Sequence, residues 1–188
     1  QKLFLDLYCG AGNRIRQTDG CTAGKKVEGW RSWNSLPLND SMTGMYNRNA
    51  YDYFVKNEKD FEGYVIVTFD LNNLKQCNDQ YGHRAGDEYI INAARIIEDN
   101  FERYGKCYRI GGDEFCCIIP KGRYFKIERV MHKIDQDVEI LNHKNIIPVP
   151  VGIAYGYAVF TADDTDPEKV RERADKDMYR NKKTMKQS

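Results

Sequence analysis

The stretch that decides the fold is KCYRIGGDEFCCIIP, residues 106–120 of a 188-residue chain. Lys106–Ile110 and Phe115–Pro120 are short runs of mostly apolar and aromatic residues, separated by Gly111-Gly112-Asp113-Glu114. Two such runs joined by a turn with a glycine pair are typical of a β-hairpin. We therefore expect two antiparallel strands with an acidic, glycine-rich turn between them.

The hairpin lies within a regular alternation of predicted helices and strands. β-Branched and aromatic residues predict a buried strand over Gly63–Asp70, and another strand follows the hairpin at Gly152–Phe160. Helical spacing and capping residues predict helices over Asn47–Asn57, Ala85–Phe101 and Arg123–Leu141, and from Asp166-Pro167 to about Met185. This order predicts an α+β sandwich of ferredoxin-like or palm type, in which helices flank a central, mainly antiparallel sheet and pack on one face of it.

Composition and charge narrow the classes of function. With 41% apolar and 30% charged residues, the chain suits one globular domain with its own core. The 29 basic and 28 acidic residues leave a net charge of +1, so any anion must be held by a local site. No segment approaches the roughly 18–20 apolar residues of a membrane span, and no signal-peptide pattern is present. We expect no contact with nucleic acid or membrane, and reduced cysteines in a cytoplasmic domain.

Residues 1–38 do not fit the alternation, and they carry both tryptophans. We expect a leader or the remnant of an upstream unit here, followed by one domain over residues 39–188. Within the leader, LDLYCGAG at residues 5–12 is similar to the first motif of S-adenosylmethionine-dependent methyltransferases. That fold needs several further βα units, so a coincidental strand and turn is the favoured interpretation.

Two aspartates lie where predicted strands end. Asp70 ends the apolar strand, and Asp113 lies in the hairpin turn, which could pair beside that strand. Two carboxylates at one sheet edge repel each other without a cation, and oxygen ligands beside a phosphate favour Mg²⁺ or Mn²⁺ over Zn²⁺. Two metals about 4 Å apart are the usual arrangement for such chemistry. Alternatively, Asp70 caps the next helix and Asp113 only makes the turn; the glycine pair favours a ligand, because it lets the backbone approach one closely.

A polar cluster follows the Asp70 strand. No GxxxxGK[ST] loop is present, so lysine and arginine side chains would have to hold phosphates, with Lys75 and Arg109 as candidates. Asn78 and Asp87 could bind a purine edge, because a carboxylate accepts two hydrogen bonds from guanine N1 and N2, whereas adenine has an acceptor at N1. Each of these side chains, taken alone, also suits a solvated surface position.

Five ordered blocks within residues 39–188 resemble the GGDEF domains of diguanylate cyclases. They are Asp40–Arg48, Phe69–Asp79, Gly82-His83 with Gly86-Asp87, Arg109–Phe115, and Ala174–Tyr179 with Lys182. The resemblance implies an enzyme that condenses two GTP into cyclic di-GMP with release of pyrophosphate, using two Mg²⁺ or Mn²⁺ per GTP. It also implies a homodimer in which each protomer binds one GTP, and an upstream sensory domain. The domain would be cytoplasmic, and upstream segments could tether it to a membrane.

The resemblance also implies a role for individual residues. Asp70, Asp113 and the Leu71 carbonyl would be metal ligands, and Asp113 would help to deprotonate the attacking 3′-hydroxyl. The catalytic set would be Asp113, Glu114 and Lys75. The expected substrate contacts are Asn78 and Asp87 to guanine, and Lys75, Arg109, Gly111, Gly112, Lys182 and Lys186 to the rest of the nucleotide, chiefly its triphosphate.

The sequence departs from the family pattern at three places. Asn72 stands where the family has a second acid, and Lys186 replaces an arginine, which keeps the charge but loses the planar fork. The arginine and aspartate of the family's RxxD product-inhibition site correspond to Glu102 and Gly105, so no primary inhibitory site is expected. The intact signature acids favour an active cyclase; the alternative is a catalytically silent module that binds GTP or product and signals through protein contacts.

Overall fold

The computed structural model describes residues 37–122 and 126–185. The predicted leader up to residue 36, its methyltransferase-like motif and Lys186 lie outside the described residues, as does the start of the helix predicted from Arg123. Across the described part of the chain, no helix has the length and apolar content needed to cross a membrane.

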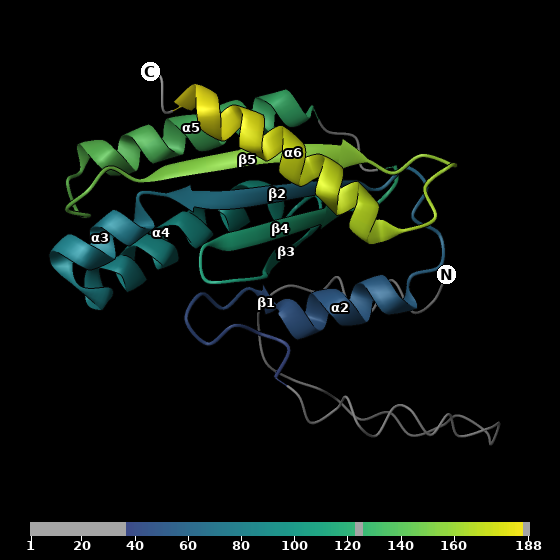
Figure 1. The fold of residues 1–188 in the computed structure, drawn as a ribbon, viewed down its shortest axis with the longest axis horizontal. Helices are drawn as coiled ribbons and strands as arrows, with labels where there is room; N and C mark the ends of the chain where they lie inside the picture. The colour runs from purple at the N-terminus through teal and green to yellow at the C-terminus, as the bar shows by residue number, and fades with distance from the viewer. Residues whose placement is uncertain (1–36, 123–125, 186–188) are drawn as a thin grey trace. The chain divides into compact units, whose positions relative to one another are not determined.

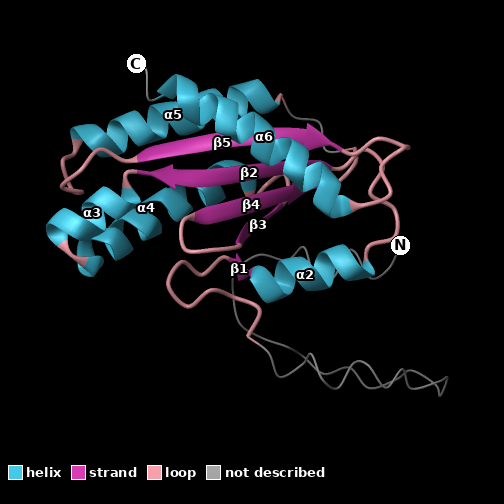
Figure 2. Cartoon of the chain, viewed as in Figure 1, coloured by secondary structure: helices cyan, strands magenta, loops and turns pink. Residues whose placement is uncertain are grey.

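The described residues alternate between helices and strands much as the sequence predicts (Figure 2). The elements are β1 (Tyr46–Asn47), α2 (Arg48–Asn57), β2 (Val65–Asn72), α3 (Leu74–Tyr81), α4 (His83–Phe101), β3 (Lys106–Arg109), β4 (Glu114–Ile119), α5 (Ile127–His143), β5 (Gly152–Val159) and α6 (Pro167–Met185). The predicted strands and helices are present, with ends that move by a few residues. β2 continues to Asn72, so Asp70 lies inside this strand and does not end it.

The strands form one sheet in the order β1-β3-β4-β2-β5. The pairs β3–β4, β4–β2 and β2–β5 are antiparallel, and only the two-residue β1 runs parallel to its neighbour β3. The predicted hairpin is confirmed, with Arg109 opposite Phe115 at the last pair before the turn. The α+β class and the mainly antiparallel sheet are therefore confirmed.

Helices cover both faces of the sheet, so the expectation of helices on one face is wrong (Figure 1). Val67, Phe69 and Leu71 of β2 pack in one core with residues of α4 and α5. Ile66 of the same strand packs in a second core with residues of α2 and α6. The physical reason is in the sequence of β2, which is apolar at consecutive positions, and such a strand needs cover on both faces.

Two short elements, α3 and β1, were not predicted from the sequence. α3 has only eight residues, LKQCNDQY, and its N-cap residue Asn73 has a left-handed backbone (φ 62°) and no capping side-chain bond. Neither its length nor its capping gives a helix signal. β1 is two residues long and ends on Asn47, whose side chain accepts a hydrogen bond from the Ala50 N–H and so also caps α2.

The last helix lies against the sheet with backbone in contact with backbone. Its predicted start is confirmed, since the Asp166 carboxylate accepts a hydrogen bond from the Glu168 N–H (3.0 Å). Farther along, a Cβ added to Gly156 of β5 would lie 2.0 Å from the Met178 nitrogen and 2.4 Å from the Ala174 carbonyl oxygen. Any side chain at position 156 would therefore push α6 away from β5.

We expect Gly156→Ala to lower the free energy of unfolding by about 1–3 kcal/mol, because two backbone segments would have to separate. The measurement is chemical denaturation of the variant and the parent protein. Gly112→Ala is the matched control, since an added Cβ there has no heavy atom within 4 Å. Equal stabilities for the parent and Gly156→Ala would contradict the close packing of α6 on β5.

Candidate active site

The site forms where β2 approaches the hairpin turn, with Asp70 on the face covered by α6. Successive side chains of a strand alternate between faces, so Asp70 shares a face with Ile66 and Thr68. Lys182 of α6 forms an ion pair with the Asp70 carboxylate, and both side chains are mostly buried. Asp70 therefore does not cap α3; its charge is neutralised by a lysine more than a hundred positions away along the chain.

The hairpin brings a second carboxylate opposite Asp70. Glu114 is the register partner of Asp70 in the antiparallel β2–β4 pair, and directly paired residues point to the same face with Cβ atoms about 4.5–5.5 Å apart. Asp113 precedes β4, and its carbonyl accepts a hydrogen bond from the Leu71 N–H (3.1 Å). The structure thus brings together Asp70, Leu71, Asp113 and Glu114, with Glu114 as the closest register neighbour of Asp70.

Arg109 holds the glycine turn through hydrogen bonds to its carbonyl groups. Its Nε donates to the Gly111 carbonyl (3.2 Å) and its Nη2 to the Gly112 carbonyl (2.9 Å). In a planar trans peptide the N–H points opposite to the preceding C=O. The N–H groups of Gly112 and Asp113 therefore point away from the guanidinium. Whether Arg109 also contacts a triphosphate stays a prediction, because in this structure its donors are bonded within the protein.

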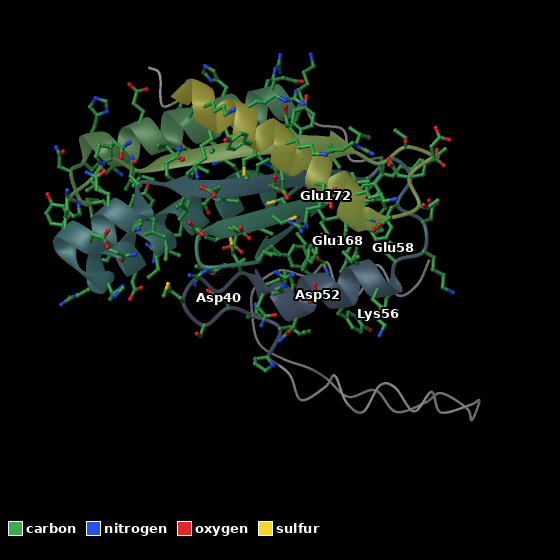
Figure 3. The ribbon with its side chains drawn as sticks, in the orientation of Figure 1. Asp40, Asp52, Lys56, Glu58, Glu168 and Glu172 are labelled. Carbon is green, nitrogen blue, oxygen red and sulfur yellow. The ribbon has the colours of Figure 1, made fainter. Side chains whose placement is uncertain are left out.

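The third contact of Arg109 is an ion pair with Asp40, which the sequence analysis did not assign to the site. Nη1 donates to Asp40 Oδ1 (3.0 Å), and Figure 3 shows Asp40 in the loop before α2. Burial raises the pKa of Asp40, but hydrogen bonds from Thr43 and Arg109 outweigh it, so the net pKa lies below its ordinary value. The sequence did offer a signal for Asp40, because this residue is the first of the Asp40–Arg48 block that resembles the family.

The glycine pair is not explained by backbone conformation. Neither Gly111 nor Gly112 has a positive φ. A Cβ at Gly111 would lie 3.2 Å from a carboxylate oxygen of Glu114, whereas a Cβ at Gly112 would meet nothing within 4 Å. Gly112 is also exposed. The second glycine therefore leaves space above the turn that the protein itself does not fill.

The expected guanine-binding residues come together at the junction of α3 and α4. Gly82, in a backbone conformation that only glycine adopts readily (φ 83°, ψ 165°), ends α3 and begins α4. A Cβ at Gly86 would lie 2.0 Å from Asn78 Oδ1, so the Asn78 amide lies directly over Gly86. Asp87, the next residue of α4, is exposed. The structure thus brings Asn78 and Asp87 to the same junction.

Three other positions predicted from the sequence lie away from these clusters. Lys75 is exposed on the first turn of α3, three residues after the end of β2. Glu102 and Gly105, where the family's inhibitory pair would lie, follow α4. A Cβ at Gly105 would lie 2.2 Å from the Ile118 carbonyl oxygen. An aspartate therefore does not fit at position 105 on this backbone, whereas the missing product brake itself stays a prediction.

The donor set fits a magnesium or manganese ion that arrives with a phosphate ligand. Among the described residues, no group of three His, Cys, Asp or Glu side chains is arranged to hold a metal alone. Mg²⁺ commonly binds through one or two carboxylates plus substrate phosphates, so the paired Asp70 and Glu114, with Asp113 and the Leu71 carbonyl beside them, suit this ion. The Lys182 ammonium group already shows that the Asp70 carboxylate takes a cationic partner.

Comparison with known proteins agrees with this geometry. Residues 38–188 match the family described as diguanylate cyclase, GGDEF domain. The chain is 30% identical over 149 residues to the diguanylate cyclase DgcS of Shewanella oneidensis, covering 76% of this chain and 49% of that protein. It is 27% identical over 167 residues to the probable diguanylate cyclase DgcC of Escherichia coli, covering 86% of this chain and 45% of that protein. The chain thus spans about half the length of these curated relatives.

Solved structures show the same fold. The GGDEF domain of DgcB from Caulobacter crescentus, determined in complex with c-di-GMP, superposes with a TM-score of 0.67 at 24% identity, over 78% of this chain and 91% of that chain. A microbial GGDEF domain described in a novel interaction mode with cyclic di-GMP superposes with a TM-score of 0.58 at 27% identity, over 78% and 94% of the two chains. The chain belongs to the diguanylate cyclase GGDEF-domain family, as the resemblance implied.

We expect Asp40→Asn to destabilise the protein by about 1–2 kcal/mol at pH 7, because Arg109 loses its charged partner. Since the folded-state pKa of Asp40 is lowered, its ionised form stabilises the fold above the unfolded pKa of about 3.9, and this contribution disappears as the pH falls through the folded pKa. Denaturation at pH 7 and pH 3 should therefore show a stability difference that shrinks at the lower pH. Asp52→Asn, on the exposed surface of α2, is the control, and a difference independent of pH would refute the assignment.

We expect Gly86→Ala to weaken binding of a non-hydrolysable GTP analogue about tenfold, because the new methyl group would displace the Asn78 amide. The fold should be kept, since the atom in the way is the end of a flexible side chain. Calorimetric titration measures the affinity, and Arg84→Ala on the same helix turn, almost fully exposed, is the control. Unchanged affinity in Gly86→Ala would remove Asn78 from nucleotide binding.

Proposed function

We propose that the chain is an active diguanylate cyclase that condenses two GTP into cyclic di-GMP and pyrophosphate. The observation that carries the proposal is the register of the hairpin: Glu114 stands opposite Asp70, and the glycine turn is docked on β2 through the Leu71 N–H. The Asp70 and Glu114 carboxylates therefore share one face of the sheet beside the turn, and the Gly112 and Asp113 N–H groups of that turn point away from Arg109. Silent members of such a family are expected to lose these acids, and this chain keeps them.

A carboxylate and an amide would bind the guanine end of the nucleotide, and N–H groups and lysines would bind its triphosphate end. Asn78 and Asp87 would accept and donate hydrogen bonds at the guanine edge, where the carboxylate matches the N1 and N2 donors. The N–H groups of Gly112 and Asp113, which point away from Arg109, would donate to phosphate oxygens. Lys75, Lys182 and Lys186 would supply positive charge to the triphosphate, with Lys182 released from Asp70 when phosphate enters.

A divalent ion bound by Asp70, the Leu71 carbonyl, Asp113 and Glu114 would polarise the α-phosphate and lower the pKa of the attacking 3′-hydroxyl. The protein's own contribution is positioning and neutralisation of charge, which can supply most of the rate enhancement in phosphoryl chemistry. Asp113, at the tip of the turn, would take up the proton of the 3′-hydroxyl.

The reaction joins two nucleotides, and the described residues supply one guanine-binding pair and one acidic turn. Two copies facing each other would therefore be required, each presenting one GTP. We propose a homodimer as the active form, and a cytoplasmic domain under the control of an upstream sensor, since the match covers only 49%, 22% and 45% of the lengths of three relatives. A membrane tether, if there is one, would belong to upstream segments.

The test is turnover of GTP with Mg²⁺ by the chain alone and by a version dimerised through a fused coiled coil, with product separated by chromatography. We expect cyclic di-GMP, and we expect Asp70→Asn to lower the rate at least a hundredfold by removing a metal ligand. Asp52→Asn should be as active as the parent.

The rival is a catalytically silent module that binds GTP or cyclic di-GMP and acts through protein contacts. Binding of a GTP analogue by the dimerised protein without any cyclic di-GMP over hours of incubation would establish this rival. Equal product formation by Asp70→Asn and the parent would instead disprove the assigned metal site.

A further inference from the structure

The hydroxyl of Tyr89 lies at the last pair of the β2–β5 ladder. Asn72 and Gly152 are register partners at the end of these two strands. The Tyr89 hydroxyl donates to the Asn72 carbonyl (2.5 Å) and accepts from the Gly152 N–H (2.7 Å). A side chain of α4 therefore occupies the position between two backbone groups at the end of the sheet, and it ties α4 to both strands.

This hydrogen bond closes a short loop of chain. From Asn72 the backbone passes through Asn73, α3 and Gly82 into α4 and returns at Tyr89, 17 residues later. Within the loop lie Lys75, Asn78 and Asp87, that is, both expected guanine-binding residues and one phosphate-binding lysine. Just before it lie Asp70 and Leu71. The Tyr89 hydroxyl thus links the strand end that carries Asp70 and Leu71 to the loop that carries Lys75, Asn78 and Asp87.

Most of the other anchors of this loop are apolar, and one long, exposed hydrogen bond runs from the Asn73 amide to the Pro150 carbonyl (3.5 Å). Leu74, Cys77 and Ile90 are buried in the core on this face of the sheet. Apolar contacts depend on area and hardly on direction, whereas a hydrogen bond fixes distance and angle. Tyr89 itself is fully buried, and burial raises its pKa, so the phenol remains protonated and can donate and accept at once. The short hydrogen bonds of the Tyr89 hydroxyl are therefore the strongest directional contacts between this loop and the ends of β2 and β5.

We infer that Tyr89 is a positioning residue for nucleotide recognition, whose hydroxyl sets where Asn78 and Asp87 stand relative to the metal-binding end of β2. The inference rests on the proposed function, because it assumes that these two residues contact guanine. Tyr89 does not touch the nucleotide; it acts through the closed loop, with Asp87 two residues away on the same helix. Loss of the hydroxyl should therefore lower the preference for guanine over adenine by more than the change in the free energy of unfolding can account for.

The test compares Tyr89→Phe with Tyr51→Phe. Both tyrosines are buried and each hydroxyl has a partner, but the Tyr51 hydroxyl donates to Glu168 of α6 on the opposite face of the sheet (3.3 Å). Dissociation constants for non-hydrolysable GTP and ATP analogues are measured with Mg²⁺ by calorimetry, and thermal unfolding is recorded for each protein. The ratio of the two constants is the readout that a merely structural role would not move.

We expect the parent to prefer the guanine analogue and Tyr89→Phe to lower that preference about tenfold, the effect of one lost hydrogen bond. Tyr51→Phe should keep the parent's ratio. A Tyr89→Phe protein with the parent's ratio overturns the inference and leaves the proposed function intact. A parent protein that binds neither analogue overturns the proposed function and this inference with it.

Amide hydrogen exchange localises the change. In Tyr89→Phe we expect faster exchange at Gly152 and over Leu74–Tyr81, with the remaining strands as protected as in the parent. Faster exchange across the whole sheet, or loss of a cooperative unfolding transition, would make Tyr89 a general core residue and overturn the positioning role.

Discussion

The ion pair between Asp70 and Lys182 is the constraint around which the site is organised. β2 is covered by helices on both faces, and Asp70 is the one charged residue within it. A carboxylate in such a strand needs a cationic partner. α6 provides it, and it can do so only because Gly156 allows the helix backbone to lie against β5. Neutralisation of the Asp70 charge therefore depends on the close packing of α6 on the sheet.

The opposite side of the site is organised by Arg109. Its guanidinium donates to two carbonyls of the glycine turn, to Asp40 and to the sulfur of Met42. Hydrogen bonds from Arg109 and from the Leu71 N–H hold the turn, and the N–H groups of Gly112 and Asp113 point away from the guanidinium. A turn with two glycines would otherwise have many conformations. The fixed guanidinium removes most of them before any ligand arrives.

Most of the fold follows from local patterns in the sequence, and the exceptions have physical reasons. The hairpin, the long helices and the Asp166 cap depend on neighbouring residues, and these predictions are confirmed. α3 is too short for a helical pattern, and β1 exists only because β3 lies beside it. The covering of both faces was implied by the apolar run of β2, but the pairing order of the strands was needed to see it.

The site divides in the same way. The family resemblance gave roles to Asp70, Asp113, Asn78 and Asp87; the structure places the first two where β2 meets the hairpin turn and the last two at the α3–α4 junction. Register was not predictable, so the position of Glu114 directly opposite Asp70 emerges only from the β2–β4 pairing. Contacts between distant segments could not be predicted either. The pairing of Asp40 with Arg109, and of Tyr89 with the end of β2, leaves no mark in the local sequence around either residue.

The close packing of α6 on β5 also decides how quickly the site can change. Because backbone meets backbone at Gly156, the helix cannot slide or rotate without separating from the sheet. Lys182 is mounted on this rigid support, but its ammonium group is carried by four methylene groups. In the proposed reaction, movement of the Lys182 ammonium group from Asp70 to a phosphate would therefore be a side-chain rotation and would require no slower movement of a helix.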